Sequence, residues 1–295
     1  MFKNLFLIFF IIIVFFLGDR IFTSFGVYLT KYSSLPEAKL YNGSLESSII
    51  IIGNSRAYRH FYEDDWSKAL NKSVKNISKP GAPLVHLETF LNDYSKIYKY
   101  PEKIIIELDC LLTDTDIISS YKFMTHLSKN YSSTLKRFDV TGFYFSKFFN
   151  LYKLNSNIYL NMIHKIFKEY EQPKLYGEID ESQISNFKNA KKETRFISKS
   201  FNLQSLLSIM RNFEGKSDLI LVISPFHPQV IKKYEKDIEK WINDIKNKTD
   251  EKIPIFDYSK TITENVFFND LYHLNNNGVI EMNKILIDDL FFEKI

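Results

Sequence analysis

Five apolar runs of strand length recur along the chain, with helical periodicity between them. The runs are Ile49–Ile52, Val74–Ile77, Lys103–Leu108, Leu219–Ile223 and Ile253–Phe256. Two of the intervening helical patterns are Leu84–Ile97 and Ile231–Lys246. Strands that alternate with helices pair in parallel through right-handed crossovers. The pattern therefore predicts an α/β fold, a three-layer α/β/α sandwich around a mostly parallel five-stranded sheet.

One connection between predicted strands is far longer than a crossover requires. About 100 residues separate Thr113 from Ser217, several times the usual length of such a connection. Its segments "FYFSKFFNLYKL" and "IYLNMIHKIFKEY" carry apolar residues at helical spacing. We expect a helical insertion at about residues 113–200, followed by a crossover helix in "FNLQSLLSIM".

An unbroken apolar run of 13 residues, Leu5–Leu17, lies near the N-terminus and is preceded by Lys3. A helix of that length rises only about 20 Å, short of a hydrocarbon core about 30 Å thick. Phe2 and Ile21–Phe22 bring it closer to spanning length. A cleaved signal peptide is the alternative, although no small-x-small site follows the run. We expect an uncleaved, single-pass signal anchor over residues 1–22.

The anchor implies a topology for the rest of the chain. The charge of Lys3 keeps the N-terminus on the cytoplasmic side. Residues 23–46 are polar and rich in breakers, which is typical of a tether. The α/β domain, residues 47–295, would then be periplasmic or extracellular.

Composition argues against several functional classes. The net charge is +4 and the basic residues are spread along the chain, so we expect no nucleic-acid partner. The single cysteine, Cys110, excludes an internal disulfide. The sequence has no His/Cys ligand cluster and no G-x-x-x-x-G-K loop. We therefore expect neither a metal ion nor a nucleotide cofactor.

The first predicted strand runs directly into a small polar motif, in the stretch "SSIIIIGNSRAYRHF". Gly53 and Asn54 tolerate tight backbone geometry, so the motif could be an ordinary turn. It could equally present Ser55 as a nucleophile at the carboxyl end of a strand, where open α/β sheets keep their sites. The motif alone leaves both interpretations open.

A second motif lies near the other end of the chain. Asp270 and His273 are three residues apart, just before the last helical pattern. This spacing lets a carboxylate reach the imidazole, fix its tautomer and leave the other nitrogen free to take a proton from a serine. A surface histidine near a helix start is the alternative.

Together, these motifs resemble the SGNH (GDSL-like) hydrolase superfamily, which has a flavodoxin-like fold. The matching stretches are "IIIIGNSRA", "NISKPGAPL" and "FFNDLYHLNNNG". With the N-terminal anchor, "GNSRA" is similar to membrane-anchored SGNH-like proteins that accompany membrane-bound O-acyltransferases. Proteins of alginate O-acetylation and of D-alanyl-lipoteichoic acid transfer are examples.

The resemblance implies roles for individual residues. Ser55 would be the nucleophile, His273 the general base and Asp270 its orienting partner. The backbone N–H groups of Ser55 and Gly81 would stabilise the oxyanion. A Pro-Gly turn is the alternative for Gly81.

One position departs from the family pattern. The superfamily places an oxyanion-donating Asn after the third strand, where this chain has Asp109. An ionised Asp would repel an oxyanion, and loss of one such donor costs about 10²–10³ in rate. Either Asp109 is protonated, or it binds a polar substrate group, or another donor substitutes. A strand-end Asp that caps a loop is the structural alternative.

Two further residues are candidates for substrate binding. Arg56 could hold a phosphate or carboxylate, or pair with an acid of the protein. His227 follows the fourth predicted strand and could touch substrate, or be a loop histidine fixed between two prolines.

The resemblance therefore implies a membrane-tethered esterase or O-acyltransferase. Its substrate would be a cell-surface polysaccharide or lipid-linked glycan, and membrane lipid would surround its N-terminal helix. The alternatives are a catalytically impaired glycan-binding module and a partner subunit of a membrane-bound O-acyltransferase.

Overall fold

The computed structural model describes residues 2–115 and 117–292. The first residue of the expected anchor, the last three of the expected α/β domain and residue 116 of the expected insertion lie outside these ranges. The chain divides into two compact units. The helical unit contains residues 1–46, 89–98 and 115–170, and the α/β unit contains residues 47–88, 99–114 and 171–295.

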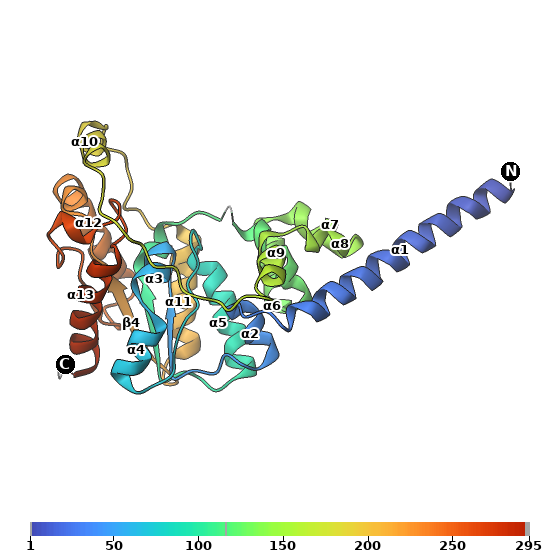
Figure 1. Ribbon diagram of the computed structural model, residues 1–295, viewed down its shortest axis with the longest axis horizontal. Coiled ribbons are helices and arrows are strands. Elements are labelled where there is room, and N and C mark those ends of the chain that lie inside the picture. The colour runs from blue at the N-terminus through green and yellow to red at the C-terminus, as the bar shows by residue number, and fades with distance from the viewer. Residues whose placement is uncertain (1, 116, 293–295) are drawn as a thin grey trace. The chain divides into compact units, whose positions relative to one another are not determined.

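The α/β unit is built on a five-stranded sheet, as the sequence predicts (Figure 1). Its strands are β1 (Ile49–Ile52), β2 (Val74–Asn76), β3 (Lys103–Glu107), β4 (Asp218–Ile223) and β5 (Ile255–Asp257). They lie in the order β2-β1-β3-β4-β5, and every pairing is parallel. All five carboxyl ends therefore meet at one edge of the sheet.

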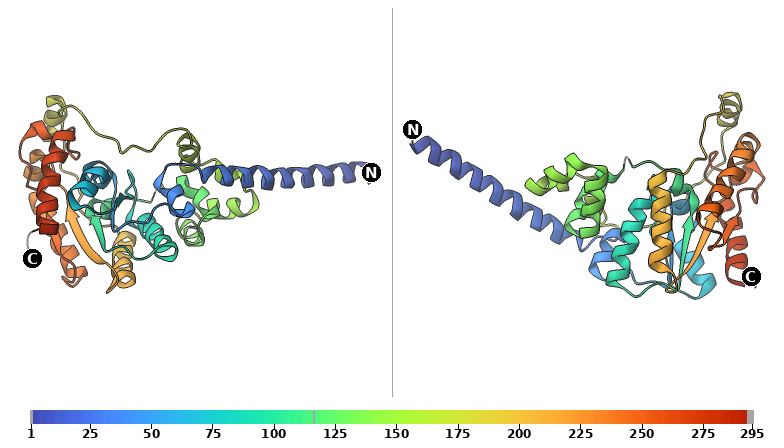
Figure 2. Two further views of the ribbon diagram at one scale, coloured as in Figure 1. Left: turned by 60° about the horizontal axis from the view of Figure 1, so that its bottom comes forward. Right: turned by 180° about the vertical axis from the view of Figure 1, so that it is seen from behind.

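Helices cover both faces of this sheet. Those of the α/β unit are α3 (Ser55–His60), α4 (Glu63–Leu70), α10 (Glu181–Asn189), α11 (Ser200–Phe213), α12 (Pro228–Lys248) and α13 (Asn276–Ile287). Helix α5 (Leu84–Ile97) begins in the α/β unit and ends in the helical unit. Helices α4 and α13 lie on one side of the sheet and α11 lies on the other (Figures 1 and 2). This is the expected three-layer arrangement.

Alternation along β1 explains the two layers. Successive side chains of a strand point to opposite faces, and all four isoleucines of β1 are buried. Ile49 and Ile51 belong to a core that includes Trp66 of α4 and Met282 of α13. The Trp66 indole N–H donates to Asn283 Oδ1 at 3.0 Å, which links α4 to α13. Because β1 is buried on both faces, apolar and polar residues do not alternate in its sequence.

The helical unit gathers segments that are far apart in sequence. Its helices are α1 (Phe2–Thr30), α2 (Pro36–Asn42), α6 (Lys129–Phe138), α7 (Val140–Phe148), α8 (Leu151–Leu154) and α9 (Asn157–His164), with a 3-10 segment at Ile118–His126. The expected insertion is thus helical as predicted. Only residues 115–170 of it belong to this unit, since residues 171–200 group with the α/β unit.

The structure differs from the expectation of a tether over residues 23–46, because much of this segment is helical. Residues 23–30 continue α1, and α2 occupies residues 36–42. Leu35 and Ala38 are buried in a small core with Phe123 and Met162 of the insertion. These partners lie more than 80 residues away in sequence, so the local polar composition hid the packing.

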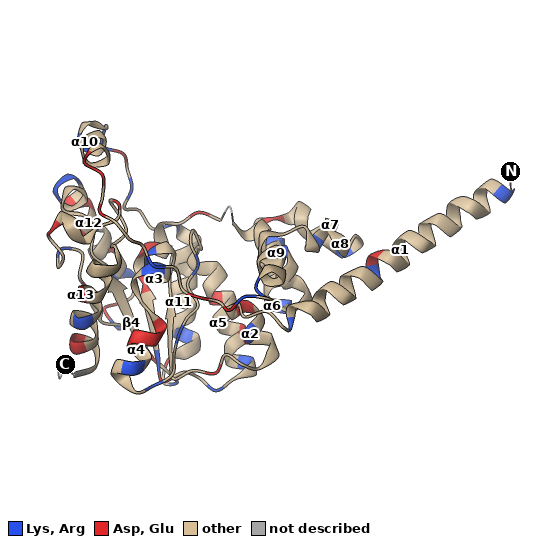
Figure 3. Cartoon of the chain, in the orientation of Figure 1, with Lys and Arg blue, Asp and Glu red and all other residues tan. Residues whose placement is uncertain are grey.

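Helix α1 is long enough and apolar enough to cross a membrane, or to serve as a signal sequence. Its side chains are almost all exposed in the described part of the chain. Figure 3 shows charge on α1 only near its N-terminus and at one point further along. Those charged residues are Lys3, Asp19 and Arg20.

The end of β1 is crowded, and this explains its glycine. A Cβ added to Gly53 would lie 2.5 Å from the Ala57 Cβ and 3.0 Å from the Glu107 Cβ. Only a residue without a side chain lets α3 and β3 approach the turn this closely. Close packing, rather than an unusual backbone conformation, therefore requires this glycine.

We expect Gly53→Ala to destabilise the α/β unit by about 1–3 kcal/mol, the usual cost of overpacking. Thermal unfolding of the full chain in detergent, followed by circular dichroism, measures this. Gly18→Ala is the control, because a Cβ there meets nothing within 4 Å. An unchanged melting temperature for Gly53→Ala would contradict the packing argument.

Candidate active site

Ser55 is the first residue of α3, directly after the turn that ends β1. The preceding residue, Asn54, caps this short helix, since its Oδ1 accepts the Arg56 N–H at 3.1 Å. The Ser55 side chain is only partly buried. The turn thus delivers a reachable hydroxyl to the carboxyl edge of the sheet.

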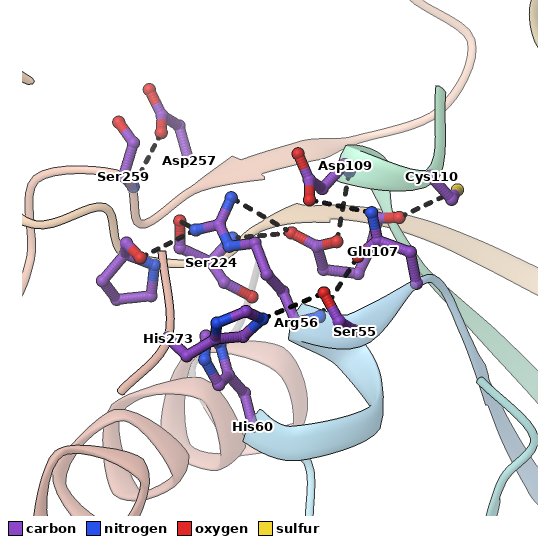
Figure 4. Close-up of polar contacts among 12 residues, drawn as sticks. Ser55, Arg56, His60, Glu107, Asp109, Cys110, Ser224, Asp257, Ser259 and His273 are labelled. Atoms are coloured by element: carbon purple, nitrogen blue, oxygen red, sulfur yellow. Dashed lines mark hydrogen bonds and ion pairs between the residues drawn. The ribbon is translucent and has the colours of Figure 1, made fainter. Parts of the chain in front are cut away.

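His273 connects Ser55 to Asp270. Figure 4 shows the first of these two contacts, between the His273 ring and the Ser55 hydroxyl. Its Nε2 lies 2.9 Å from Ser55 Oγ, and its Nδ1 lies 2.8 and 3.0 Å from the two Asp270 oxygens. A carboxylate can only accept, so Nδ1 carries the proton and Nε2 accepts from the serine hydroxyl. The three residues predicted from sequence therefore form one hydrogen-bonded chain.

Asp270 is fixed by more than the histidine. Its Oδ1 also accepts the backbone N–H groups of Tyr272 at 2.8 Å and His273 at 2.9 Å. Burial alone would raise the pKa of Asp270, but these bonds and the His273 ring hold it below its ordinary value. The carboxylate is therefore ionised at neutral pH, as an orienting partner must be.

His60, at the other end of α3, supports the segment that carries His273. Its Nε2 accepts the Leu274 N–H at 3.0 Å, and its ring centroid lies 6.1 Å from that of His273. Burial, and then the charge of Arg56, hold the pKa of His60 well below its ordinary value. A neutral ring can accept this bond. The sequence offered no signal for this role, because the partner lies 214 positions away.

Arg56 does not face substrate. Its side chain is 1% exposed, and its guanidinium lies over the Phe226 ring at 3.7 Å. It donates to the carbonyls of Ser224 and Pro225 and lies 3.6 Å from Glu107 Oε1. The expectation of a substrate contact is corrected here: the alternative, pairing with an acid of the protein, is what the structure shows.

Glu107 is the buried partner that the sequence reading missed. Its Oε2 accepts the Asp109 N–H at 3.1 Å, and its Oε1 accepts the Ser224 N–H at 3.4 Å. Burial raises its pKa to about 7; the Arg56 charge opposes this shift, and the Asp109 charge adds to it. The signal in the sequence that could have indicated this buried carboxyl is that Glu107 ends the apolar run "KIIIE".

Asp109 lies beside the turn that bears Ser55. Its Oδ2 accepts an Asn54 amide N–H at 2.8 Å, and the same amide reaches Thr113 Oγ1 at 3.3 Å. The Asp109 side chain is half-buried, and the backbone N–H of Asp109 donates to Glu107 Oε2. Asp109 is thus oriented by an amide donor that the sequence reading did not consider.

Gly81 lies in the turn that follows β2. Its φ of +69° favours glycine, and the Lys79 N–H in the same turn donates to the Gly53 carbonyl at 3.1 Å. This bond attaches the Gly81 turn to the Ser55 turn. The oxyanion role of Gly81 stays a prediction.

His227 is not open to substrate. It is fully buried, its Nδ1 accepts the Gln229 N–H at 3.2 Å, and its ring packs against Phe268 at 5.0 Å. It caps the start of α12. The expectation of a substrate contact gives way to the alternative of a histidine fixed between prolines, because the α12 turn directs the ring inward.

Two cavities of the α/β unit lie apart from Ser55. One of about 630 Å³ includes Arg211, Asp218 and Lys252, and one of about 660 Å³ lies between residues 192–198 and α12. Within the described ranges, no group of three or more His, Cys, Asp or Glu side chains could hold a metal ion.

Glu107 should make stability depend on pH. Its pKa rises from 4.5 to about 7 on folding, so the folded protein binds this proton more tightly than the unfolded chain. Stability from this group falls as pH rises through that window and then levels off. The change is about 3 kcal/mol in all. Glu107→Gln should lack it.

Urea unfolding of both proteins between about pH 4 and pH 8 measures the difference. The pKa values of buried His60, His86 and His227 and of half-buried His126 are lowered, so these groups act in the opposite sense, but they are common to both proteins and cancel. The exposed Glu264→Gln should follow wild type. A constant difference between wild type and Glu107→Gln would show that Glu107 titrates normally.

Comparison with known proteins gives distant matches. No family model and no curated protein matches the chain. A Streptococcus pneumonia structure described as "a putative platelet activating factor" is 15% identical, with 95% of this chain and 97% of that chain covered and a TM-score of 0.44. A family two carbohydrate esterase from Clostridium thermocellum, solved as an active site mutant, is 11% identical (83% and 64% covered, TM-score 0.35). The acetyl xylan esterase Est2A from Butyrivibrio proteoclasticus is 12% identical (82% and 64% covered, TM-score 0.32). At these TM-scores, the matches assign no activity to this chain.

Proposed function

We propose that the chain is a membrane-tethered, extracytoplasmic serine esterase or O-acyltransferase of the SGNH type. Its substrate would be a cell-surface polysaccharide or a lipid-linked glycan. The observation that carries this proposal is the continuous hydrogen-bonded chain from Ser55 through His273 to Asp270, with atom separations of 2.9 and 2.8 Å. Such a chain activates a serine that is otherwise a weak nucleophile.

The geometry supports a two-step acyl transfer. His273 Nε2 takes the Ser55 proton as Oγ attacks the ester carbonyl, and Asp270 stabilises the imidazolium. The proton then passes to the leaving alcohol, and an acyl-serine remains. In the second step His273 takes a proton from water or a sugar hydroxyl, whose oxygen attacks the acyl carbonyl. The bond from the acyl carbon to Ser55 Oγ then breaks, and His273 returns the proton to Oγ. The N–H groups of Ser55 and Gly81 would stabilise the oxyanion in both steps.

Asp109 favours transfer to a polymer over hydrolysis of small esters. A carboxylate stands about where the family has an amide donor, so stabilisation of the oxyanion is weaker. A small ester brings little remote binding energy, whereas a polymer can offset this loss through distant contacts. Asp109 could also bind the acceptor hydroxyl directly.

The anchor supports a location at the cell envelope. Helix α1 has the length and composition to span a membrane, and Lys3 would hold its N-terminus inside. A membrane-bound O-acyltransferase would be a fitting partner, because it could supply the acyl group.

Asp109 also favours a second candidate function. If the carboxylate suppresses turnover altogether, the same site would bind a glycan without acylating it, or serve within a partner subunit. Covalent reactivity of Ser55 separates this candidate from the first.

We expect a fluorophosphonate probe to label Ser55 in the full chain. Ser55→Ala and His273→Ala should abolish labelling, and Asp270→Asn should slow it by up to about 10⁴-fold through the wrong tautomer. Mass spectrometry of the labelled peptide is the measurement, and the exposed Ser182→Ala is the control.

Two results would count against the proposal. If the His273→Ala variant is still labelled, Ser55 does not need His273 for its reactivity, and the proposed triad is wrong. A wild-type protein that is not labelled at all would favour the binding module.

We also expect Asp109→Asn to raise kcat/KM for p-nitrophenyl acetate by about tenfold or more, since a restored donor is worth up to about 10²–10³. Polymer acylation in cells should fall if Asp109 binds the acceptor. Asp114→Asn, at an exposed carboxylate, is the matched control. If Asp109→Asn lowers both activities alike, Asp109 serves the fold rather than the choice of acceptor.

A further inference from the structure

The α7–α8 hairpin, residues 140–154, presents large apolar side chains that keep more than a third of their surface exposed. Phe148 is 63% exposed, Phe145 50%, Tyr144 49%, Leu151 38% and Phe149 37%. These side chains come from two helices and the short link between them. A contiguous apolar surface of this kind marks an interaction site.

The hairpin is attached to α1 within the helical unit (Figure 2). The ring of Phe149 stacks on Phe16 with centroids 6.3 Å apart, and it meets Phe15 edge-on at the same distance. Further along α1, Gly26 lies close to Leu154 and Tyr159, so that a Cβ there would come within 2.8 Å of the Tyr159 hydroxyl. The apolar surface of α1 therefore continues onto the hairpin.

Asp19 fixes the depth of this contact. Its side chain is 1% exposed, and it accepts the N–H groups of Asn150 at 3.0 Å and Leu151 at 2.7 Å, with Arg20 as its ion-pair partner. A charge at membrane depth is stable only when it is paired in this way. Asp19 thus holds the start of α8 level with its own position on α1.

The length of α1 then places the hairpin against lipid. A span of about 20 residues is needed to cross the hydrocarbon core, so one that begins near Leu5 ends near Ser24. Asp19 lies before that end, by five residues or about 7 Å of helix. The link between α7 and α8 is therefore at or below the outer boundary of the hydrocarbon.

A basic hollow accompanies the apolar surface. It has a volume of about 220 Å³, and its lining includes Lys136, Lys147 and Lys153. The Lys136 and Lys147 ammonium groups lie 5.9 and 4.7 Å from the centroid of the Phe143 ring. The other lining residues are Phe143 and four hydroxyl residues, Thr125, Ser132, Ser133 and Ser146. Three ammonium groups with no carboxylate in this lining suit an anion.

We propose that the α7–α8 hairpin inserts into the outer leaflet of the membrane that α1 crosses, and that the basic hollow binds phosphates of lipid headgroups. This inference rests on the anchor of the proposed function. Apolar side chains enter the acyl region while lysines reach the headgroups, the arrangement of an interfacial helix. Each lysine near an anionic surface contributes about 1 kcal/mol.

Fluorescence quenching measures the depth of the hairpin. The full chain is placed in phosphatidylcholine nanodiscs and labelled with bimane at a cysteine introduced at Phe148, or at Tyr144 as a second site. Ile12→Cys marks the hydrocarbon and Lys284→Cys marks water, while Cys110 is buried and should not react. We expect doxyl lipids to quench Phe148→Cys and Tyr144→Cys at a shallow depth and Ile12→Cys at a deep one. Aqueous iodide should quench only Lys284→Cys.

A second arm tests the basic hollow. Phosphatidylglycerol in the nanodiscs should increase lipid quenching at the hairpin. The variant with Lys136, Lys147 and Lys153 all changed to Gln should lose this increase. A control with exposed Lys232, Lys236 and Lys246 changed to Gln has the same net charge and should keep it. Inorganic phosphate at equal ionic strength should leave the increase unchanged.

Three contrary results would each overturn one part of this proposal: the insertion of the hairpin, the anchor, or the binding of headgroups. Iodide quenching at both hairpin sites, with Ile12→Cys still protected by lipid, would place the hairpin in water. The insertion would then be wrong, and the apolar surface would suit a protein partner instead. Iodide quenching at Ile12→Cys as well would also overturn the anchor. A lipid preference that survives the lysine changes, or that inorganic phosphate removes, would overturn headgroup binding. Fluorophosphonate labelling of Ser55 in the same samples reports separately on the proposed chemistry.

Discussion

The buried pair of Arg56 and Glu107 joins the ends of three neighbouring strands, and the arrangement around Ser55 depends on it. Arg56 follows β1, Glu107 ends β3, and the carbonyls that Arg56 binds follow β4. Glu107 accepts two backbone N–H groups from the same loops. Removing one partner of such a pair leaves an uncompensated charge in a medium that solvates it poorly. The serine is therefore held one residue away from a buried side chain that contacts two carbonyls, a carboxylate and an aromatic ring.

Much of the α/β unit could be predicted from the sequence because its signals are local. The four isoleucines of β1 and the helix Leu84–Ile97 match their predicted bounds, since apolar runs and helical periodicity are read within a few residues. Each motif left its alternatives open, and Ser55, His273 and Asp270 could be proposed together because their order and placement resemble the SGNH superfamily. What brings them together is the parallel pairing that the alternating pattern predicted, because it places all the carboxyl ends of the strands at one edge of the sheet.

The remainder depended on contacts between distant segments. Arg56 and His227 were placed at the correct edge of the sheet, but the sequence did not show that their side chains turn inward. His60 and Glu107 looked like ordinary polar residues, because burial is set by helices far away in the chain. Residues 23–46 looked like a tether for the same reason: the partners of Leu35 lie in the insertion. The polarity of a segment does not show which distant residues pack over it, so burial of this kind could not be predicted from local sequence.

The bond between Ser55 and His273 joins residues 218 positions apart, and the bond that supports it, from Leu274 to His60, spans 214. Synthesis runs from the N-terminus, so α3 emerges long before the histidine segment that activates it. Until that segment has been made and packed against α3, the Ser55 hydroxyl has no histidine partner. The order of synthesis therefore makes this hydrogen-bonded site one of the last features of the chain to form, and a chain that stops before residue 273 lacks it.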